Sequence, residues 1–344
     1  MRILVIGGNG FIGTPLVREL RSGGHEVAVF HRRAHAGPDS EGVQQIEGNR
    51  NRLPEHRAEI ARFKPDVVVD LVLSSEAQAR QLMETVSGVT GRVVVASSMD
   101  VYRAWGVLKG IEPGALEPIP ITEHSPVRST RQLYAVEDLK KLENVFSWVD
   151  EGYDKIAVED VVMNDNELPG TVVRLPMIYG PGDRLHRLHP VLKRIEDGRT
   201  RMLLSEDLAA WLAPRGYVED VAHAIVLAAT SKKAARHIYN VCEEPNLSEL
   251  EWQKRIVKQT KWRGKFVTLP QERTPRHLLV PLNLMQQVVV SSALIRNDLG
   301  YAETVEPETA MSRTIAWEQQ NPPQSIDAKQ FDYQAEDAAL EGSG

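Results

Sequence analysis

The sequence predicts an α/β fold in which a doubly wound parallel sheet is followed by a smaller, mainly helical domain. Two observations support this prediction. In the first half of the 344-residue chain, short β-branched runs alternate with amphipathic stretches, which is the pattern of a parallel sheet covered by helices. In addition, the first apolar run leads directly into a glycine-rich turn and a helical pattern, which is how a βαβ unit begins.

Five runs are expected to form strands of this sheet. They lie at residues 2–6, 26–31, 66–72, 92–97 and 171–174. Between the first two, apolar residues recur at helical spacing, and Gly23 and Gly24 close the helix. Later in the chain we expect a helix at 218–229, a strand at 237–241 and mainly helices over 247–317.

The segment from residue 102 to about 150 has a weaker pattern. Prolines at positions 113, 118, 120 and 126 interrupt it, and only residues 133–146 look helical. Long segments without strands are usually functional or form mobile lids, so we expect one of these roles for this segment.

Composition and charge exclude several classes of protein. Hydrophobic residues make up 42% and charged residues 26% of the chain, as in ordinary globular proteins. The net charge of -6 weighs against a nucleic-acid-binding surface, so a nucleic-acid partner is not expected. The single cysteine, Cys242, cannot form an intramolecular disulfide, which favours a reducing cytoplasm.

No segment has the features of an export signal or a membrane span. The N-terminal apolar run ends at a glycine after four residues, which is too short for a signal-peptide core. Pro281 and Asn283 interrupt the most apolar later stretch, residues 278–295. We expect that stretch to form a packed helix or, as an alternative, a partner-facing surface.

The first glycine-rich turn has the spacing of a dinucleotide-binding fingerprint. Gly7, Gly10 and Gly13 follow a strand and precede a helix, which is the context that gives the motif meaning. The first glycine allows the tight turn, the second lets the backbone approach a pyrophosphate, and the third lets helix and strand pack closely. With Phe11 and Ile12, these residues are the expected pyrophosphate site at a helix N-terminus.

Further motifs carry a resemblance that covers nearly the whole chain. The stretches are GGNGFIG, SSMDVY (97–102), RLPMIYGPGD (174–183), RGYVEDVAHAI (215–225), IYNVCEEPNLSELE (238–251) and SSALIRNDLGY (291–301). In this order they resemble the extended or atypical short-chain dehydrogenase/reductase superfamily, in its NAD-dependent epimerase/dehydratase branch. The resemblance implies a Rossmann-type sheet and a substrate cleft at the carboxyl ends of its strands.

The resemblance also implies a division of the chain. Residues 1–178 and 216–244 would form the NAD(P)-binding Rossmann domain, residues 179–215 and 245–330 the substrate domain, and residues 331–344 an acidic tail that is surface-lying or frayed. By the same resemblance, Asn49 would contact adenine, and Pro176 and Ile178 would lie beside the nicotinamide. A homodimer is expected by analogy alone.

The end of the second strand favours NADP over NAD. An acidic residue there would bind the ribose 2′-hydroxyl and mark NAD. This strand instead ends in His31, Arg32 and Arg33, whose positive charge suits a 2′-phosphate. Solvated loop residues are the alternative interpretation.

The catalytic pattern of the family is only partly present. Redox members use a tyrosine with a lysine four residues later on one helical face, together with a serine at a strand end. Ser98 fits the serine and Lys155 the lysine, but Glu151 stands where the tyrosine belongs. The nearest tyrosine, Tyr153, is two residues from Lys155, so the two side chains point apart on a regular helix.

Three explanations remain open. Tyr153 lies before the first regular turn and bends into the site, Tyr102 or Tyr134 supplies the proton from a loop, or the site has lost its redox chemistry. The predicted catalytic set is therefore Ser98, Tyr153 and Lys155, with Lys155 also holding the cofactor.

The expected substrate contacts are Tyr102, Arg184, Arg187 and Arg215. The basic stretch 184–201 falls in the family region that holds a nucleotide, which implies a small anionic substrate, because arginine binds a diphosphate well. A solvated helix face is the alternative. His186 and His189 lack a third ligand, so no metal site is predicted.

These observations favour an NAD(P)-dependent epimerase, dehydratase or reductase that acts on a sugar-like or nucleotide-linked substrate. The alternative is a protein without turnover that senses NADPH or binds RNA, as atypical relatives resembling chloroplast stem-loop RNA-binding proteins do. The broken Tyr/Lys spacing and the basic stretch 184–201 motivate this alternative.

Overall fold

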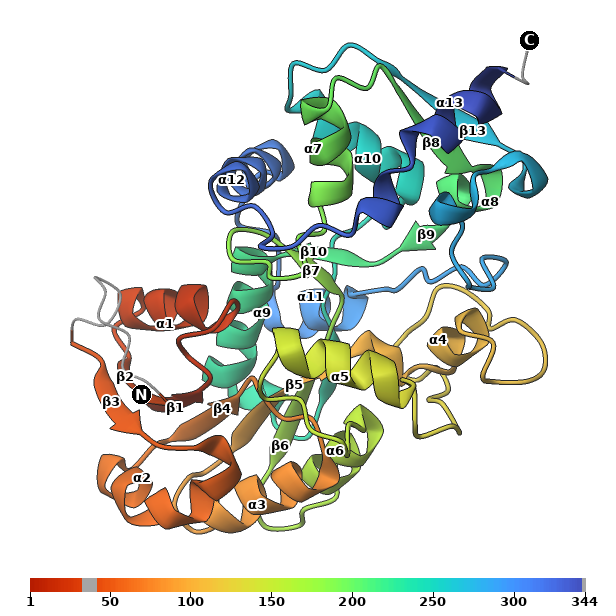
Figure 1. Cartoon of the computed structure of the whole chain (residues 1–344). Coiled ribbons are helices and arrows are strands. Elements are labelled where there is room, and N and C mark those ends of the chain that lie inside the picture. The colour runs from red at the N-terminus through yellow and green to blue at the C-terminus, as the bar shows by residue number, and fades with distance from the viewer. Residues whose placement is uncertain (33–41, 342–344) are drawn as a thin grey trace.

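The computed structural model describes residues 1–32 and 42–341, and its centre is a seven-stranded parallel sheet. The strand order is β11-β6-β5-β4-β1-β2-β3, so the chain builds outward from β1 in both directions (Figure 1). This order confirms the predicted doubly wound α/β fold. The strands are β1 (Arg2–Ile6), β2 (Glu26–His31), β3 (Gln44–Glu47), β4 (Val67–Asp70), β5 (Val93–Ser98), β6 (Gly170–Leu175) and β11 (Ile238–Asn240).

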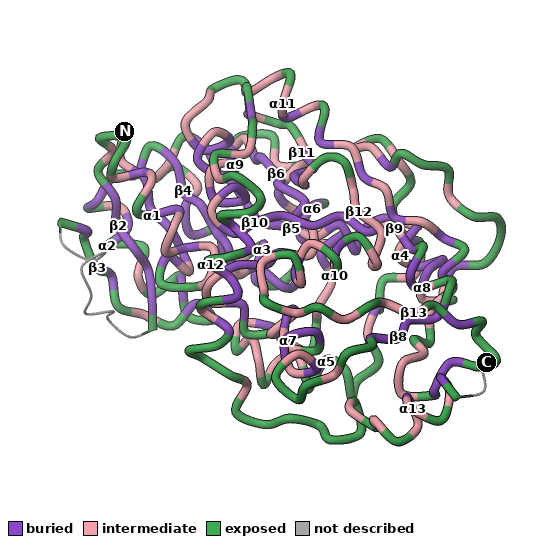
Figure 2. Tube along the Cα trace, turned by 90° about the horizontal axis from the view of Figure 1, so that it is seen from above, coloured by how far each residue is buried: buried purple, intermediate pink, exposed green. Residues whose placement is uncertain are grey.

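Each face of the sheet has its own hydrophobic core, because alternate residues of a strand point to opposite faces. Ile3 and Val5 of β1 pack into one core, and Leu4 and Ile6 into the other. The helices α1 (Gly13–Ser22) and α9 (Val218–Thr230) cover the first face. The second is covered by α2 (Arg57–Phe63), α3 (Glu76–Val86) and α6 (Lys155–Met163). Buried residues follow the strands in Figure 2.

A second, smaller part lies above the carboxyl ends of these strands (Figure 1). Its strands form three two-stranded pairs, β7 with β10, β8 with β13 and β9 with β12. The strands are β7 (Met177–Tyr179), β8 (Arg201–Ser205), β9 (Leu212–Ala213), β10 (Arg215–Tyr217), β12 (Leu247–Ser248) and β13 (Lys265–Leu269). The helices are α7 (His189–Glu196), α8 (Glu206–Ala210), α10 (Glu249–Lys258), α11 (Ala293–Leu299), α12 (Pro307–Gln320) and α13 (Tyr333–Glu341).

The segment between β5 and α6 contains two helices that lead toward the site. They are α4 (Arg103–Leu108) and α5 (Val136–Val145). In α5 only Leu139 is buried, so most of this helix lies at the surface. The short 3-10 turns in the described chain are η2 (Arg50–His56), η3 (Met99–Val101), η4 (Lys232–Ala234), η5 (Gln271–Arg273), η6 (Arg276–Leu278) and η7 (Ala328–Phe331).

Two expectations about the C-terminal part were wrong. The apolar stretch 278–295 does not form a packed helix, because it runs irregularly between η6 and α11 and buries single residues such as Leu284 and Val288. Of the two alternatives for the acidic tail, surface-lying or frayed, the second is wrong for the described residues up to 341, because α13 buries Glu336 and Leu340. Glu336 pairs with Arg194 of α7 at 2.7 Å, which docks the acidic helix on the basic stretch.

Across the described residues, the structure contains no helix that is long and apolar enough to cross a membrane.

Candidate active site and dinucleotide pocket

The glycine loop joins β1 to α1 and brings the backbone of the two elements into close contact. Gly7 has a φ of 86°, which favours glycine. A Cβ atom on Gly13 would lie only 2.2 Å from the carbonyl oxygen of Gly7, so the third glycine is required for packing. No described side chain caps the start of α1 at Ile12, and the N–H of Thr14 donates to the Gly10 oxygen at 3.0 Å. An anion at this helix start would therefore be bound by N–H groups of the loop itself.

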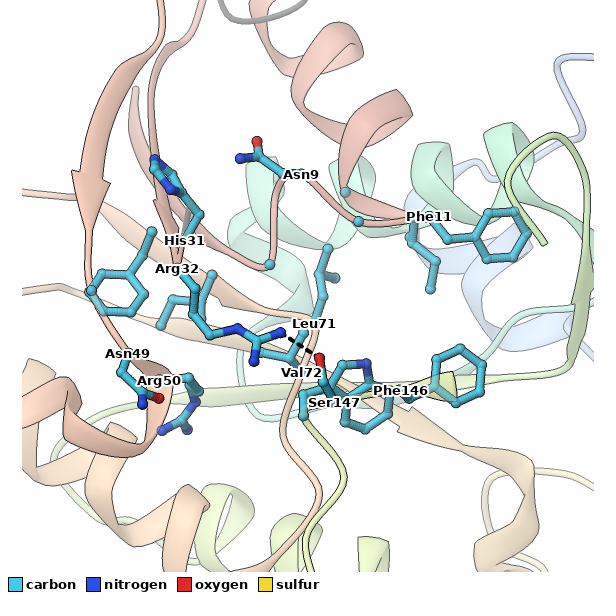
Figure 3. Close-up of a pocket in the computed structure, with 18 of the residues that line it drawn as sticks. Asn9, Phe11, His31, Arg32, Asn49, Arg50, Leu71, Val72, Phe146 and Ser147 are labelled. Atoms are coloured by element: carbon cyan, nitrogen blue, oxygen red, sulfur yellow. Dashed lines mark hydrogen bonds between the residues drawn. The ribbon is translucent and has the colours of Figure 1, made fainter. Parts of the chain in front are cut away.

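A cavity of about 400 Å³ lies against this loop (Figure 3). It brings together most of the predicted cofactor residues, with further walls from residues 49–51 and 146–148. The predicted residues that line it are Gly7, Gly10, Phe11, Ile12, Gly13, His31, Arg32, Asn49 and Arg184. Its described lining does not include Lys155, Pro176 or Ile178. Arg33 lies outside the described residues.

The end of β2 gives this cavity a basic wall. His31 is 7% exposed, and neither of its ring nitrogens has a hydrogen-bond partner among the described residues. Arg32 reaches across the cavity and donates a hydrogen bond to Ser147 (Figure 3). The described lining holds three arginines and no carboxylate. Among the residues that the structure describes, this wall therefore lacks the acidic group that binds a free ribose 2′-hydroxyl.

Residues 49–51 form a second wall that sequence reasoning found only in part. Asn49 lies just before η2, and its side-chain oxygen accepts a hydrogen bond from the backbone N–H of Asn51 at 3.0 Å. Arg50 is buried and pairs with Asp70 at the end of β4, with Nε and Oδ2 3.1 Å apart. The ion pair with Asp70 therefore holds Arg50 against the sheet. Arg50 was not identified from the sequence, because it belongs to no recognisable motif.

Lys155 is the first residue of α6, and its side chain is 3% exposed. Its Nζ donates hydrogen bonds to the backbone oxygens of Leu73 and, at 3.1 Å, Ala96. It also lies 5.3 Å from the ring centre of Trp148. Burial lowers the pKa of Lys155 to about 8, although the negative charge of Asp100 opposes that shift. Among the described residues, the ammonium group thus donates to carbonyl oxygens and not to a phenol.

Tyr153 lies two residues before α6, ahead of its first regular turn. Its hydroxyl donates to Oδ2 of Asp100 at 2.9 Å, and the hydroxyl of Tyr134 donates to the same oxygen at 3.3 Å. The two rings pack edge to face with centres 5.4 Å apart. Burial, followed by the charge of Asp100, raises the pKa of Tyr153 well above its ordinary value. The structure therefore pairs the predicted tyrosine with a carboxylate.

Ser98 ends β5 beside this cluster. Its Oγ accepts a hydrogen bond from the backbone N–H of Asp100 at 3.2 Å and so caps η3. Asp100 was not among the predicted site residues, although it stands inside the SSMDVY motif two residues after Ser98. Its position at the end of a parallel strand was the signal that could have identified it.

Tyr102, which was expected to contact the substrate, occupies a core position, whereas the predicted place of Pro176 and Ile178 beside the nicotinamide stays a prediction. Tyr102 is fully buried, its hydroxyl donates to Asn240 at 2.7 Å, and Arg174 stacks 4.6 Å from its ring centre. Its side chain therefore belongs to the core, not to a substrate surface. Pro176 and Ile178 lie at the passage from β6 into β7, where Ile178 is buried.

Two of the three arginines expected to bind the substrate are paired within the chain, and the third, Arg184, lines the dinucleotide pocket. Arg187 contacts Asp183 at 2.8 Å, and the buried Arg215 pairs with Glu249. Farther along the basic stretch, Arg199 pairs with Asp337 of α13. The anionic substrate stays a prediction, and these ion pairs remove part of the charge on which it rested.

The residues that the structure describes contain no cluster of three or more histidine, cysteine or acidic side chains that could hold a metal ion. His186 instead contacts Glu318 at 2.8 Å.

Comparison with known proteins identifies the family. A sequence model of the NAD dependent epimerase/dehydratase family matches residues 3–242, which include the glycine loop, Ser98, Tyr153 and Lys155. The chain belongs to this family. Family membership confirms the resemblance seen in the sequence, and the family is NAD(P)-dependent. The assignment of the glycine-loop pocket to the cofactor stays a prediction.

One curated relative is 2'-dehydrokanamycin reductase from Streptomyces kanamyceticus, which is 29% identical over 185 residues. The match covers 53% of this chain and 44% of the relative, so it spans less than half of that protein.

Solved structures share the fold over nearly the whole chain. An NAD complex of dTDP-glucose 4,6-dehydratase from Bacillus anthracis has a TM-score of 0.64 and 17% identity, covering 93% of this chain and 97% of its own. UDP-glucose 4-epimerase from Thermotoga maritima, solved with UDP-glucose, has a TM-score of 0.64 and 16% identity, covering 93% and 99%. At this identity the likeness supports the fold alone.

Proposed function

We propose that this protein is an NADP(H)-dependent oxidoreductase that interconverts a hydroxyl and a carbonyl group on a sugar. The observation that carries the proposal is the placement of two polar centres at the same edge of the sheet. The dinucleotide pocket follows β1, and the hydroxyls of Ser98 and Tyr153 lie where β5 ends. A bound nicotinamide supplies or accepts the hydride, and the residues of the chain position the substrate oxygen and handle its proton.

The pocket residues favour a 2′-phosphate on the cofactor. The backbone at Gly10 and Ile12 would hold the pyrophosphate, as the uncapped start of α1 requires. Neither ring nitrogen of His31 has a hydrogen-bond partner among the described residues, and Arg32 already extends into the cavity. A guanidinium binds phosphate with charge-assisted hydrogen bonds, and the described lining has no carboxylate that would repel it.

The ion pairs of the second part support a sugar that carries no diphosphate. Arg187 is paired with Asp183, and Arg215 with Glu249. A diphosphate would have to break these ion pairs to bind the two arginines, and the free energy of breaking them would offset part of the free energy of binding. The curated relative is named for a ketone of kanamycin, an amino sugar, which agrees with a substrate of this kind.

Equilibrium binding tests the cofactor assignment. NADPH and NADH are titrated into cofactor-free protein, and we expect NADPH to bind about tenfold more tightly or better. Arg32→Asp should abolish this preference, and Arg263→Asp, a change at an exposed arginine that does not line the pocket, should keep it. Equal affinity for the two cofactors in the unmodified protein would contradict the assignment.

Turnover tests the reaction. Kanamycin and UDP-glucose are each incubated with protein and NADP⁺, and the formation of NADPH is followed by absorbance. We expect NADPH to form with kanamycin and not with UDP-glucose. Formation with UDP-glucose alone would refute the proposed substrate class. If neither compound reacts although NADPH binds, the result favours the reading of a cofactor-binding protein without turnover.

A further inference from the structure

The carboxylate of Asp100 is the most unusual polar group near the predicted catalytic residues. Asp100 is 6% exposed and lies in η3, the short turn that follows β5. Its Oδ2 accepts hydrogen bonds from Tyr153 and Tyr134, whereas its Oδ1 is buried and has no hydrogen-bond partner among the described residues. A buried carboxylate oxygen without a donor is costly, so it requires an explanation.

The charged groups around Asp100 come from three neighbouring segments. Lys155 of α6 and Lys109, which follows α4, attract it electrostatically, and Lys109 lies 4.3 Å from the ring centre of Tyr134. Arg128 donates from Nε to the backbone oxygen of Asp100 at 2.6 Å. Within the described chain, none of these cations forms an ion pair with the carboxylate, so its hydrogen-bonded partners are the two phenols.

Lys155 is not available to act on a phenol in the usual way. Its ammonium group donates to the carbonyls of Leu73 and Ala96, which tie α6 to the ends of β4 and β5. We propose that Asp100, in place of Lys155, is the positioning residue that controls the proton of Tyr153. The inference rests on the proposed oxidoreductase function and names the proton path at that site.

The proposed proton path consists of two coupled proton transfers. When a substrate alcohol is oxidised, its O–H bond breaks and the proton moves to the phenol oxygen of Tyr153. The phenol's own O–H bond breaks at the same time, and that proton moves to Oδ2 of Asp100. The carbon-bound hydrogen leaves as hydride to the oxidised nicotinamide. Reduction of the ketone runs the same transfers in reverse.

The relay keeps Tyr153 neutral before and after each turnover. A phenolate is disfavoured here because burial and the nearby carboxylate raise the pKa of Tyr153. Asp100 therefore carries the change in charge. Reduction therefore starts from protonated Asp100, whereas oxidation starts from its carboxylate.

The first test needs no substrate. Full-length protein is labelled with ¹³C at Cζ of tyrosine, the Tyr153 signal is assigned from Tyr153→Phe, and its ionisation is followed by NMR. In Asp100→Asn we expect the pKa of Tyr153 to fall by about one unit or more, because a nearby negative charge is removed. Asp160→Asn, at an exposed position of α6, should leave it unchanged. An unchanged Tyr153 pKa in folded Asp100→Asn would overturn the inference.

The second test is the pH profile of kanamycin oxidation with NADP⁺. We expect Asp100→Asn and Tyr153→Phe each to lower the rate about 100-fold or more, the double variant to lose little beyond either single one, and Asp100→Glu to restore part of the activity. Across this profile, Tyr134→Phe should retain a higher rate than Asp100→Asn. Full activity in folded Asp100→Asn would overturn the relay. If unmodified protein does not oxidise kanamycin, the substrate proposal fails, and the NMR result alone decides the role of Asp100.

Discussion

Replacing Lys155 by methionine should change the pH dependence of stability in a defined way. The lysine is 3% exposed, and burial lowers its pKa to about 8, compared with 10.5 for the ordinary group. On raising the pH, the folded chain therefore releases this proton before the unfolded chain does. Between about pH 8 and 10.5 the unfolded chain binds more protons at this residue, so the free energy of unfolding rises with pH.

The magnitude follows from the difference between the two pKa values. A gap of about 2.5 units, between 10.5 and about 8, corresponds to about 3 kcal/mol at 1.36 kcal/mol per unit. Methionine does not titrate and fills a similar volume. The free energy of unfolding of the unmodified protein, relative to Lys155→Met, should therefore increase by up to about 3 kcal/mol across this pH range.

Urea unfolding of both proteins at several pH values in that range measures the difference directly. Lys254→Met, at an exposed position of α10, is the matched control and should show a difference that is independent of pH. A pH-independent difference for Lys155→Met as well would refute the reasoning, because it would mean that burial does not disfavour the charged form of Lys155.

Three further predictions concern the loop and the helices that support the site. Gly13→Ala should weaken NADPH binding about tenfold or more in a calorimetric titration, because the new Cβ would meet the Gly7 oxygen at 2.2 Å; unchanged affinity would speak against the loop geometry. The hydrogen bond with Glu19 raises the pKa of His223 in the folded protein. His223→Gln should therefore lower the stability to urea most below about pH 6.5, and this difference should disappear as the pH rises through the raised pKa of the folded state. A larger loss of stability at high pH would contradict this. Glu336→Gln leaves the buried Arg194 without its carboxylate and should cost about 3 kcal/mol or release α13 to proteases, and neither effect would be seen if the helix were frayed.

Much of the sheet could be predicted because its signals are local. The predicted bounds of β1 and β2 are those of the structure, since each strand is a buried run of apolar residues that ends at turn-forming or basic residues. β3 was not predicted, because only Ile46 of its four residues is buried and its sequence shows no apolar pattern. An edge strand of this kind is defined by pairing with β2, which the sequence does not reveal.

The dinucleotide loop was predictable for the same reason, since its three glycines act within one turn. The catalytic cluster was not. Tyr153 and Asp100, which are hydrogen-bonded, are 53 residues apart in the sequence. Helical periodicity also does not predict where the side chain of Tyr153 lies, because this residue precedes α6. The partners of the basic stretch were also hidden, because Arg194 and Glu336 are 142 residues apart. Contacts of this length depend on tertiary packing, which patterns in the sequence do not specify.

Binding of NADPH to the unmodified protein and to Gly10→Glu tests the central claim most directly. A Cβ at Gly10 would approach only the Gly7 oxygen, at 3.2 Å, so the variant should fold while its carboxylate enters the pyrophosphate site. We expect one NADPH per chain for the unmodified protein and no measurable binding for the variant. Equal binding to both proteins, or none to the unmodified protein, would contradict it.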